Sequence, residues 1–260
     1  MKHIFLLLTT ALIFAGTLGA QRDISKEALG TSIIDFRYTL QVPAQDMAER
    51  FGVNSAVGAG FLYKTKSNWL IGIELNYMFS QNIKNSDSLL WDLEVHPGEF
   101  IISNSGGSSE VRLHERGMNG FVKFGKLFSI LSPNPNSGFF VTVGAGYLGY
   151  KIRIDNVASK ALIFADNADG YNDYLKGYDR LTGGFALSEN VGYMLFSNSR
   201  LLNFYVAADF MQGFTKNKRI YDFDRRAYTD QNTRHDFLYG FRVGWIFALY
   251  QRPPKDFYYD

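Results

Sequence analysis

Seven segments of the chain place apolar or aromatic residues at every second position, and the connections between them alternate in length. The segments span residues 51–64, 68–82, 114–129, 138–155, 181–196, 201–216 and 234–250. A period of two is typical of β-strands. The connections 65–67, 130–137 and 197–200 are short, whereas 83–113, 156–180 and 217–233 are long and polar. Tight turns at one end and long loops at the other are typical of barrels in an outer membrane.

An eighth strand is needed, because bacterial membrane barrels have an even number of strands. The segment 31–42 supplies it, since Ile34, Phe36, Tyr38 and Leu40 alternate there with polar residues. The sequence therefore predicts an all-β fold, an eight-stranded antiparallel up-and-down transmembrane β-barrel with long external loops. The connection 43–50 becomes the first external loop, and both the N- and C-termini are expected in the periplasm of an outer-membrane protein.

The first twenty residues have the pattern of a secretory signal peptide. Lys2 and His3 precede an apolar stretch, and the small residues Gly19 and Ala20 precede a polar segment. We expect residues 1–20 to be this signal and residues 21–260 to form one outer-membrane β-barrel domain. The chain has no cysteine, which excludes disulfides and thiolate metal sites. A formal net charge of +2 gives no basic surface for nucleic acid, so no nucleic-acid partner is expected.

The two faces of the expected strands differ in character. In the last strand Tyr239, Phe241 and Trp245 share one face, while Arg242 and the glycines beside it share the other. The polar face of a soluble sandwich would instead be rich in Lys, Glu and Thr. Small residues with isolated charges are typical of a narrow lumen. Strand glycines such as Gly60 are expected to mark bends or tight packing inside that lumen.

The inward charges predict an interior ion-pair network. Asp209 and Arg242 fall at nearly the same height on neighbouring strands, and barrel closure places Arg37 on the other side of Arg242. Glu74 and Lys123 form a second pair on adjacent strands. The network is either a polar gate or an ion-pair plug. We favour the plug, because side chains fill the interior of an eight-stranded barrel.

Glu189 does not fit the regular alternation of segment 181–196. It falls on the outward face with Leu187 and Val191, where its charge would be costly against lipid. We therefore expect a β-bulge near 187–188 that turns Glu189 inward and adds it to the network, or else a different register.

The long connection 83–113 is unusually apolar for a solvated loop. We consider it either a docking patch for a partner or lipid, or a small core packed on loop 156–180, and we favour packing. The residues concerned are Leu89, Leu90, Trp91, Leu93, Phe100 and Ile101.

The sequence offers little for catalysis. His96, His114 and His235 lie in or beside loops, and no Gly-x-Ser-x-Gly pattern occurs. Hydrolysis would need a nucleophile, a base and a group that orients the base. We expect no catalytic residue, cofactor or metal site.

With its signal peptide, eight strands and aromatic final strand, the chain resembles the small outer-membrane β-barrel proteins of Gram-negative bacteria, of the OmpA-barrel, OmpX and OmpW kind. The resemblance implies insertion by the barrel-assembly machinery and contact with outer-membrane lipid. It also implies roles in envelope integrity, adhesion or small-solute passage, and it carries over no catalytic residue.

Three functional hypotheses follow. The first is a non-enzymatic barrel with a side-chain-filled lumen, acting through its external loops in envelope structure or in binding an envelope protein or ligand. The second is a narrow channel for small or apolar solutes, which requires the interior charges to leave a path. The third is a lipid-modifying barrel enzyme, which requires His114 or His235 to meet a serine and a carboxylate.

Overall fold

The computed structural model describes residues 27–84, 86–91, 101–102, 108–109, 111–156, 176–197 and 202–249. The expected signal peptide at 1–20 lies outside these ranges. The elements are β1 Thr31–Gln45, η1 Asp46–Glu49, β2 Asn54–Lys64, β3 Trp69–Ser80, α2 Ser86–Leu90, β4 Ile101–Ile102, β5 Ser108–Ser109, β6 Val111–Phe128, β7 Gly138–Asn156, β8 Thr182–Leu195, β9 Phe204–Asn217, β10 Tyr221–Asp222, β11 Ala227–Tyr228 and β12 Arg234–Leu249.

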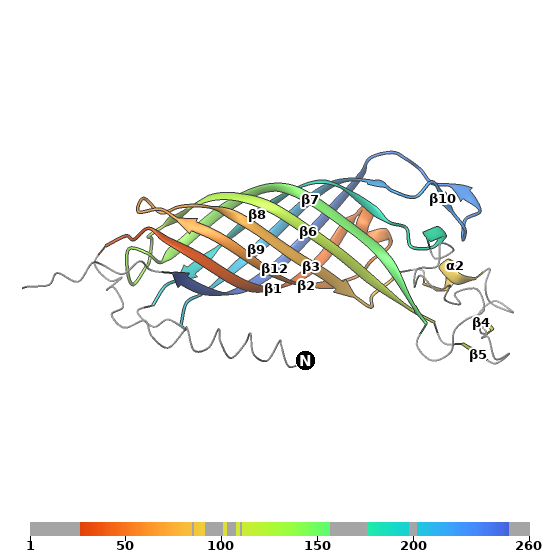
Figure 1. Ribbon diagram of the computed structural model, residues 1–260, viewed down its shortest axis with the longest axis horizontal. Helices are drawn as coiled ribbons and strands as arrows, with labels where there is room; N and C mark the ends of the chain where they lie inside the picture. Colours follow the sequence, from red (N-terminus) through yellow and green to blue (C-terminus); the bar gives the residue numbers. More distant parts are fainter. Residues whose placement is uncertain are drawn as a thin grey trace, which may run out of the picture.

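Eight of these strands form a closed antiparallel barrel (Figure 1). The order is β1-β12-β9-β8-β7-β6-β3-β2, and β2 closes on β1. Each barrel strand thus pairs with the barrel strands before and after it in the sequence, and the first pairs with the last. This is the up-and-down topology, and segment 31–42 is the first barrel strand as predicted. The predicted fold class is confirmed.

The two ends of the barrel differ. The connections 65–68, 129–137 and 196–203 are short and meet at the end where β1 begins and β12 finishes. The opposite end carries η1 and the small elements between the other strands, and Figure 1 shows α2, β4, β5 and β10 gathered beyond it. We call these the short-turn end and the long-loop end.

The outward face of the barrel carries a belt of large apolar and aromatic side chains. Val122 is 63% exposed, Leu75 62% and Phe241 57%, whereas the neighbouring Arg242 is buried. The sequence-predicted division of β12 into an apolar outer face and a small or polar inner face is confirmed. No helix within the described ranges is both long and apolar enough to cross a membrane.

The inner face is crowded, and glycines provide room for larger side chains. A Cβ atom on Gly60 would lie 2.0 Å from Nη2 of Arg37 and 2.5 Å from Oδ1 of Asp35. A Cβ atom on Gly244 would lie 2.1 Å from Cε1 of Tyr205. Real Cβ contacts are never this short, so both positions need glycine for the packing that the structure shows.

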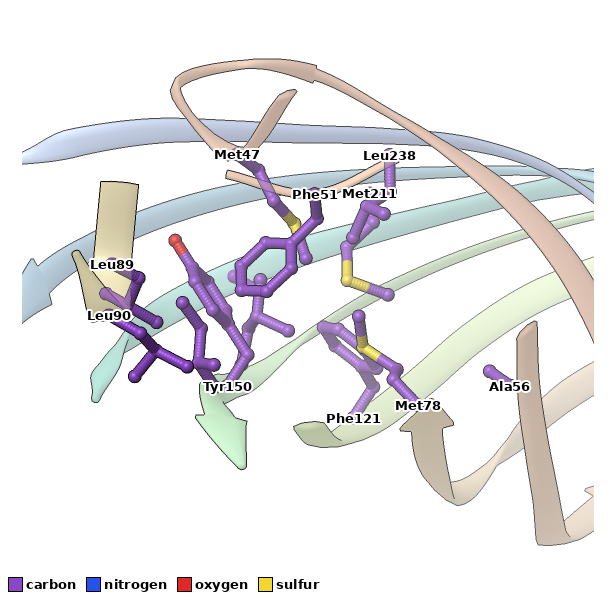
Figure 2. Close-up of a cluster of buried hydrophobic side chains, with 13 residues drawn as sticks. Met47, Phe51, Ala56, Met78, Leu89, Leu90, Phe121, Tyr150, Met211 and Leu238 are labelled. Carbon is purple, nitrogen blue, oxygen red and sulfur yellow. The ribbon is translucent and has the colours of Figure 1, made fainter. Parts of the chain in front are cut away.

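Two apolar clusters fill the lumen toward its ends. The cluster at the long-loop end includes Met47, Phe51, Met78, Leu89 and Tyr150, several of which Figure 2 shows converging from different elements. The cluster at the short-turn end comprises Leu29, Ile33, Leu70, Leu127, Phe140, Met194, Phe196, Tyr205, Ala207 and Ile246. The ion-paired residues Arg37, Glu74, Lys123, Asp209 and Arg242 lie between them, whereas the buried Lys64, Glu115 and Asp236 lie nearer the barrel ends.

Candidate functional site

The centre of the lumen network is Glu74 on β3. Nη1 of Arg37 donates a hydrogen bond of 2.5 Å to Oε2 of Glu74, and Nη1 of Arg242 donates one of 3.0 Å to the same oxygen. Nζ of Lys123 lies 3.6 Å from Oε1 of Glu74. All four side chains are buried. One carboxylate therefore interacts with three cations carried by β1, β6 and β12.

Asp209 on β9 is the second acceptor of the network. Nη2 of Arg242 lies 2.7 Å from Oδ1 of Asp209. Asn190 on β8 donates to Oδ1 at 2.5 Å, and Nε2 of Gln41 on β1 donates to Oδ2 at 3.0 Å. A fully buried carboxylate needs such partners, because water cannot solvate it there.

Asp35 is the third acceptor. Nε and Nη2 of Arg37 donate to its two carboxylate oxygens at 2.8 and 2.7 Å, and the hydroxyl of Tyr205 donates at 2.9 Å. Such forked Arg–carboxylate pairs fix the guanidinium geometry. Nζ of Lys123 in turn donates to Ser188 at 2.6 Å and to Asn190 at 2.8 Å.

The network is balanced in charge and reaches across the lumen. Three cations form ion pairs with three carboxylates on strands β1, β3, β6, β9 and β12. Side chains on β8 add hydrogen bonds to the network. Glu74 and Arg242 bond to each other although β2 and β1 lie between their strands. The adjoining cavity measures about 30 Å³, which is room for one or two water molecules.

Sequence reasoning placed five of these residues inside the barrel, and the structure brings all five together. They were expected as two separate groups, and the structure joins the groups through the contacts of Glu74 with Arg37 and Arg242. Sequence reasoning missed Asp35, Asn190 and Tyr205. Asp35 shares the inward face of β1 with Arg37, so the same alternation that placed the arginine could have identified the aspartate.

The expectation for Glu189 was wrong. Glu189 is exposed on the outward face of β8, where it pairs with Val143 on β7 and Phe210 on β9. The register of β8 runs from Thr182 to Leu195 without the expected bulge. Regular alternation instead turns Ser188 and Asn190 inward, where both bind Lys123.

At the long-loop end, apolar side chains close the mouth of the barrel. The rings of Phe51 and Tyr150 contact edge to face with centroids 5.5 Å apart. Leu89 and Leu90 on α2 are buried in the same cluster. Of the two alternatives, docking or packing, these two leucines pack, and they do so on the barrel mouth. Trp91 is 47% exposed.

The rest of the apolar stretch in loop 83–113 is less fully described. Leu93 and Phe100 lie outside the described residues, and Ile101 lies in β4. The suggested packing partner, loop 156–180, is also largely outside them.

Charged residues tie the loops at this end together. Arg180 forms an ion pair with Asp224, and Nη2 of Arg219 lies 2.5 Å from Oδ2 of Asp179. Nη1 of Arg50 donates to Oγ1 of Thr182 at 3.0 Å. Burial lowers the pKa of Arg50, with the positive charge of Arg234 acting in the same direction.

An exposed group of aromatic and basic residues lies on the outside of these loops. The rings of Tyr221 and Tyr228 are 5.5 Å apart, and Tyr228 is 80% exposed. The guanidinium of Arg226 lies 5.7 Å from the centre of the Trp91 ring, and Nε1 of Trp91 donates to the carbonyl of Asp224 at 3.3 Å. We call Trp91, Tyr221, Arg226 and Tyr228 the loop patch.

Two of the three loop histidines are described. Nε2 of His114 lies 3.4 Å from Oδ2 of Asp155. The ring of His235 contacts Phe214 edge to face. Neither has a serine hydroxyl as a hydrogen-bond partner within the described ranges, and no group of metal-ligating side chains gathers there. His96 lies outside the described residues.

Comparison with solved structures finds small outer-membrane barrels. They include Ail of Yersinia pestis (TM-score 0.40, 9% identity, covering 84% of this chain and 99% of that one). Neisserial surface protein A has a TM-score of 0.36 and 9% identity, and the match covers 83% of this chain and 96% of that one. The N-terminal β-barrel domain of Pseudomonas aeruginosa OprF has a TM-score of 0.34 and 11% identity, and the match covers 84% of this chain and 99% of that one. No protein-family model and no curated protein matches the sequence. The fold described above rests on the strand register alone.

Proposed function

We propose that this protein is a non-enzymatic outer-membrane barrel whose lumen is closed by side chains and whose long-loop end binds a partner. The apolar belt supports membrane insertion. A closed sheet leaves no strand edge unpaired, so it can face hydrocarbon, and its exposed Phe, Leu, Ile and Val side chains suit that solvent.

The main observation that supports a closed lumen is the network that joins Glu74 to Arg242 across it. A conducting path would have to pass these pairs and also the apolar clusters on both sides. Apolar constrictions exclude ions, because an ion would have to lose its hydration water to pass through them. The structure thus favours a plug over a narrow channel.

Planar-bilayer recording tests this closed lumen. The folded protein, identified by its faster migration on a cold detergent gel before boiling, is added to bilayers at known density. We expect no discrete conductance steps. Arg242→Ala is also expected to stay closed, because the apolar clusters remain. Discrete ion currents through the unaltered protein would contradict the plug.

The loop patch is the part of the molecule that we propose binds a protein of the envelope or of a neighbouring surface. Exposed Trp, Tyr and Arg side chains dominate the binding energy of protein interfaces. The contacts of Trp91 with Asp224 and Arg226 hold the patch in a defined geometry before binding, which lowers the entropic cost of association.

A photoreactive amino acid at Tyr228 tests this patch in intact cells. We expect a specific protein crosslink that Trp91→Ala weakens. The same amino acid at Tyr239, on the lipid-facing belt, is the matched control. Equal crosslinking of one protein at both sites, or no dependence on Trp91, would contradict the proposal.

A further inference from the structure

Glu189 is an ionisable residue in the middle of a largely apolar surface. Along the outward face of β8 it lies between Phe185 and Leu187 on one side and Val191 and Tyr193 on the other. Its carboxylate has no hydrogen-bond or ion-pair partner among the described residues. The other charged side chains on outward faces of the barrel strands lie toward the strand ends, such as Lys126 and Lys216.

The position of Glu189 is well inside the apolar belt. Barrel strands rise roughly 3.3 Å per residue and tilt by about 40°, so the stretch from Phe185 to Leu195 covers about 25 Å, the height of the apolar band of such barrels. An ionisable side chain at this depth marks a functional contact and needs a partner.

A hydrogen-bond donor lies beside this carboxylate. Gln212 on β9 also points outward, in the next row of the sheet, where it pairs with Leu187. Diagonal neighbours on adjacent strands lie within reach of long side chains. The outward residues Ala145 and Ala208, diagonal to Glu189, are small, whereas Val143 and Phe210 directly opposite it are larger. The patch therefore presents an acceptor and a donor together, with small residues beside them.

We propose that this patch, formed by Glu189, Gln212, Ala145 and Ala208, is the contact through which a second copy of the chain packs in the membrane. A two-fold axis places the same patch on both sides of an interface. Glu189 of each copy then accepts a hydrogen bond from Gln212 of the other. Small residues and polar hydrogen bonds are the features that hold spanning segments together where no hydrophobic force acts between them. The proposal rests on membrane insertion of the barrel.

Thiol crosslinking in native membranes tests the contact, because the chain has no cysteine of its own. Ala145→Cys introduces one thiol at the patch. Ala59→Cys introduces one on β2, which is also outward-facing and exposed but lies on the opposite side of the barrel. A short bis-maleimide is expected to give a dimer with Ala145→Cys and not with Ala59→Cys.

Substitutions of Glu189 and Gln212 distinguish a dimer held by a specific contact from crosslinking caused by crowding in the membrane. Each polar pair inside a membrane changes association a few-fold, so Glu189→Leu, which removes two equivalent hydrogen bonds, is expected to lower the dimer yield about sevenfold. Gln212→Leu is expected to do the same, and Ile73→Leu on β3 is the neutral control. Glu189→Gln keeps hydrogen-bonding capacity and is expected to retain most of the dimer.

The mobility shift on boiling, measured on the outer-membrane fraction, shows for each variant that the barrel is folded there, so a failure of insertion is seen separately. Three results would overturn the proposal: equal crosslinking at both cysteines, a dimer yield that neither leucine variant changes, or a crosslink from position 145 to a different protein.

Discussion

Residues 189 and 190 are neighbours on β8, and they meet opposite environments. Asn190 points inward and hydrogen-bonds with Lys123 and Asp209, in a network whose three cations and three carboxylates balance. Glu189 points outward among apolar side chains. The charges of this network are paired within one chain. No described residue on the outer surface offers Glu189 a countercharge.

The interior charges contribute less to net stability than to the choice of strand register. Buried ion pairs gain little net stability over apolar packing, because desolvation offsets the attraction, yet removal of one partner is strongly destabilising. We therefore expect the network to specify the strand register more than to add net stability. Only a barrel closed with β12 against β1 in this register brings Arg242 and Arg37 to the same oxygen of Glu74.

The largest expected effect comes from Glu74→Ala. The substitution leaves Lys123 without a carboxylate partner and removes one partner each from Arg37 and Arg242. We expect the free energy of unfolding in lipid vesicles to fall by about 3–5 kcal/mol. Glu49→Ala is the control, since Glu49 is 70% exposed and lies 3.6 Å from Arg234, and exposed pairs contribute about 0–1 kcal/mol. Equal effects of the two substitutions would remove the distinction between inside and outside.

A smaller loss of stability is expected from Gly60→Ala. The added methyl group collides with the guanidinium of Arg37 and the carboxylate of Asp35. Overpacking of this kind costs about 1–3 kcal/mol. Gly120→Ala is the matched control, because its methyl group would meet the flexible end of Leu75. Urea titration of both variants gives the comparison, and a Gly60 variant as stable as the Gly120 variant would mean that the network can shift freely.

Glu189→Leu is expected to change stability in the opposite direction. In vesicles with no more than one barrel each, removal of the outward charge should raise the free energy of unfolding by about 1–2 kcal/mol, less than the cost of a basic residue at the membrane midplane. Val191→Leu provides a neutral baseline at the next outward position. A loss of stability would show that Glu189 has a stabilising partner within its own chain.

The smallest effect is expected in the loops. Burial, with the nearby carboxylate of Asp224, raises the pKa of Asp222. The folded pKa lies above the unfolded value, so the stabilising contribution of the proton is present at low pH and lost as pH rises through the folded pKa. Tryptic cleavage at the exposed Arg225 should therefore quicken from mildly acidic to neutral pH, relative to Asp222→Asn at each pH. If the cleavage rates of the unaltered protein and of Asp222→Asn changed with pH in the same way, the pH dependence could not be assigned to Asp222.

The strands and their faces were predictable from the sequence, because a period of two reports directly which side chains share a face. The pairs Asp209–Arg242 and Glu74–Lys123 followed from strand order. The contact of Glu74 with Arg242 did not, since it depends on the stagger of the strands around the closed barrel, which no local pattern records.

Glu189 was expected inside because a charge against lipid is unfavourable for a single chain. The structure depends on what else is near, since Asn190 already occupies the inward position on β8. For the apolar stretch of loop 83–113, packing was favoured over docking, with loop 156–180 as the partner. Leu89 instead packs on the barrel mouth.

The most direct test of the central claim is a double-mutant cycle between Glu74 and Arg242. The free energy of unfolding is measured in vesicles for the unaltered protein, Glu74→Gln, Arg242→Met and the double variant. Charges paired across a filled lumen predict a coupling energy of at least about 1 kcal/mol, with the double variant less destabilised than the sum of the single ones. Effects that add within about 0.5 kcal/mol would mean that the two side chains are separately solvated, as in an open, water-filled pore.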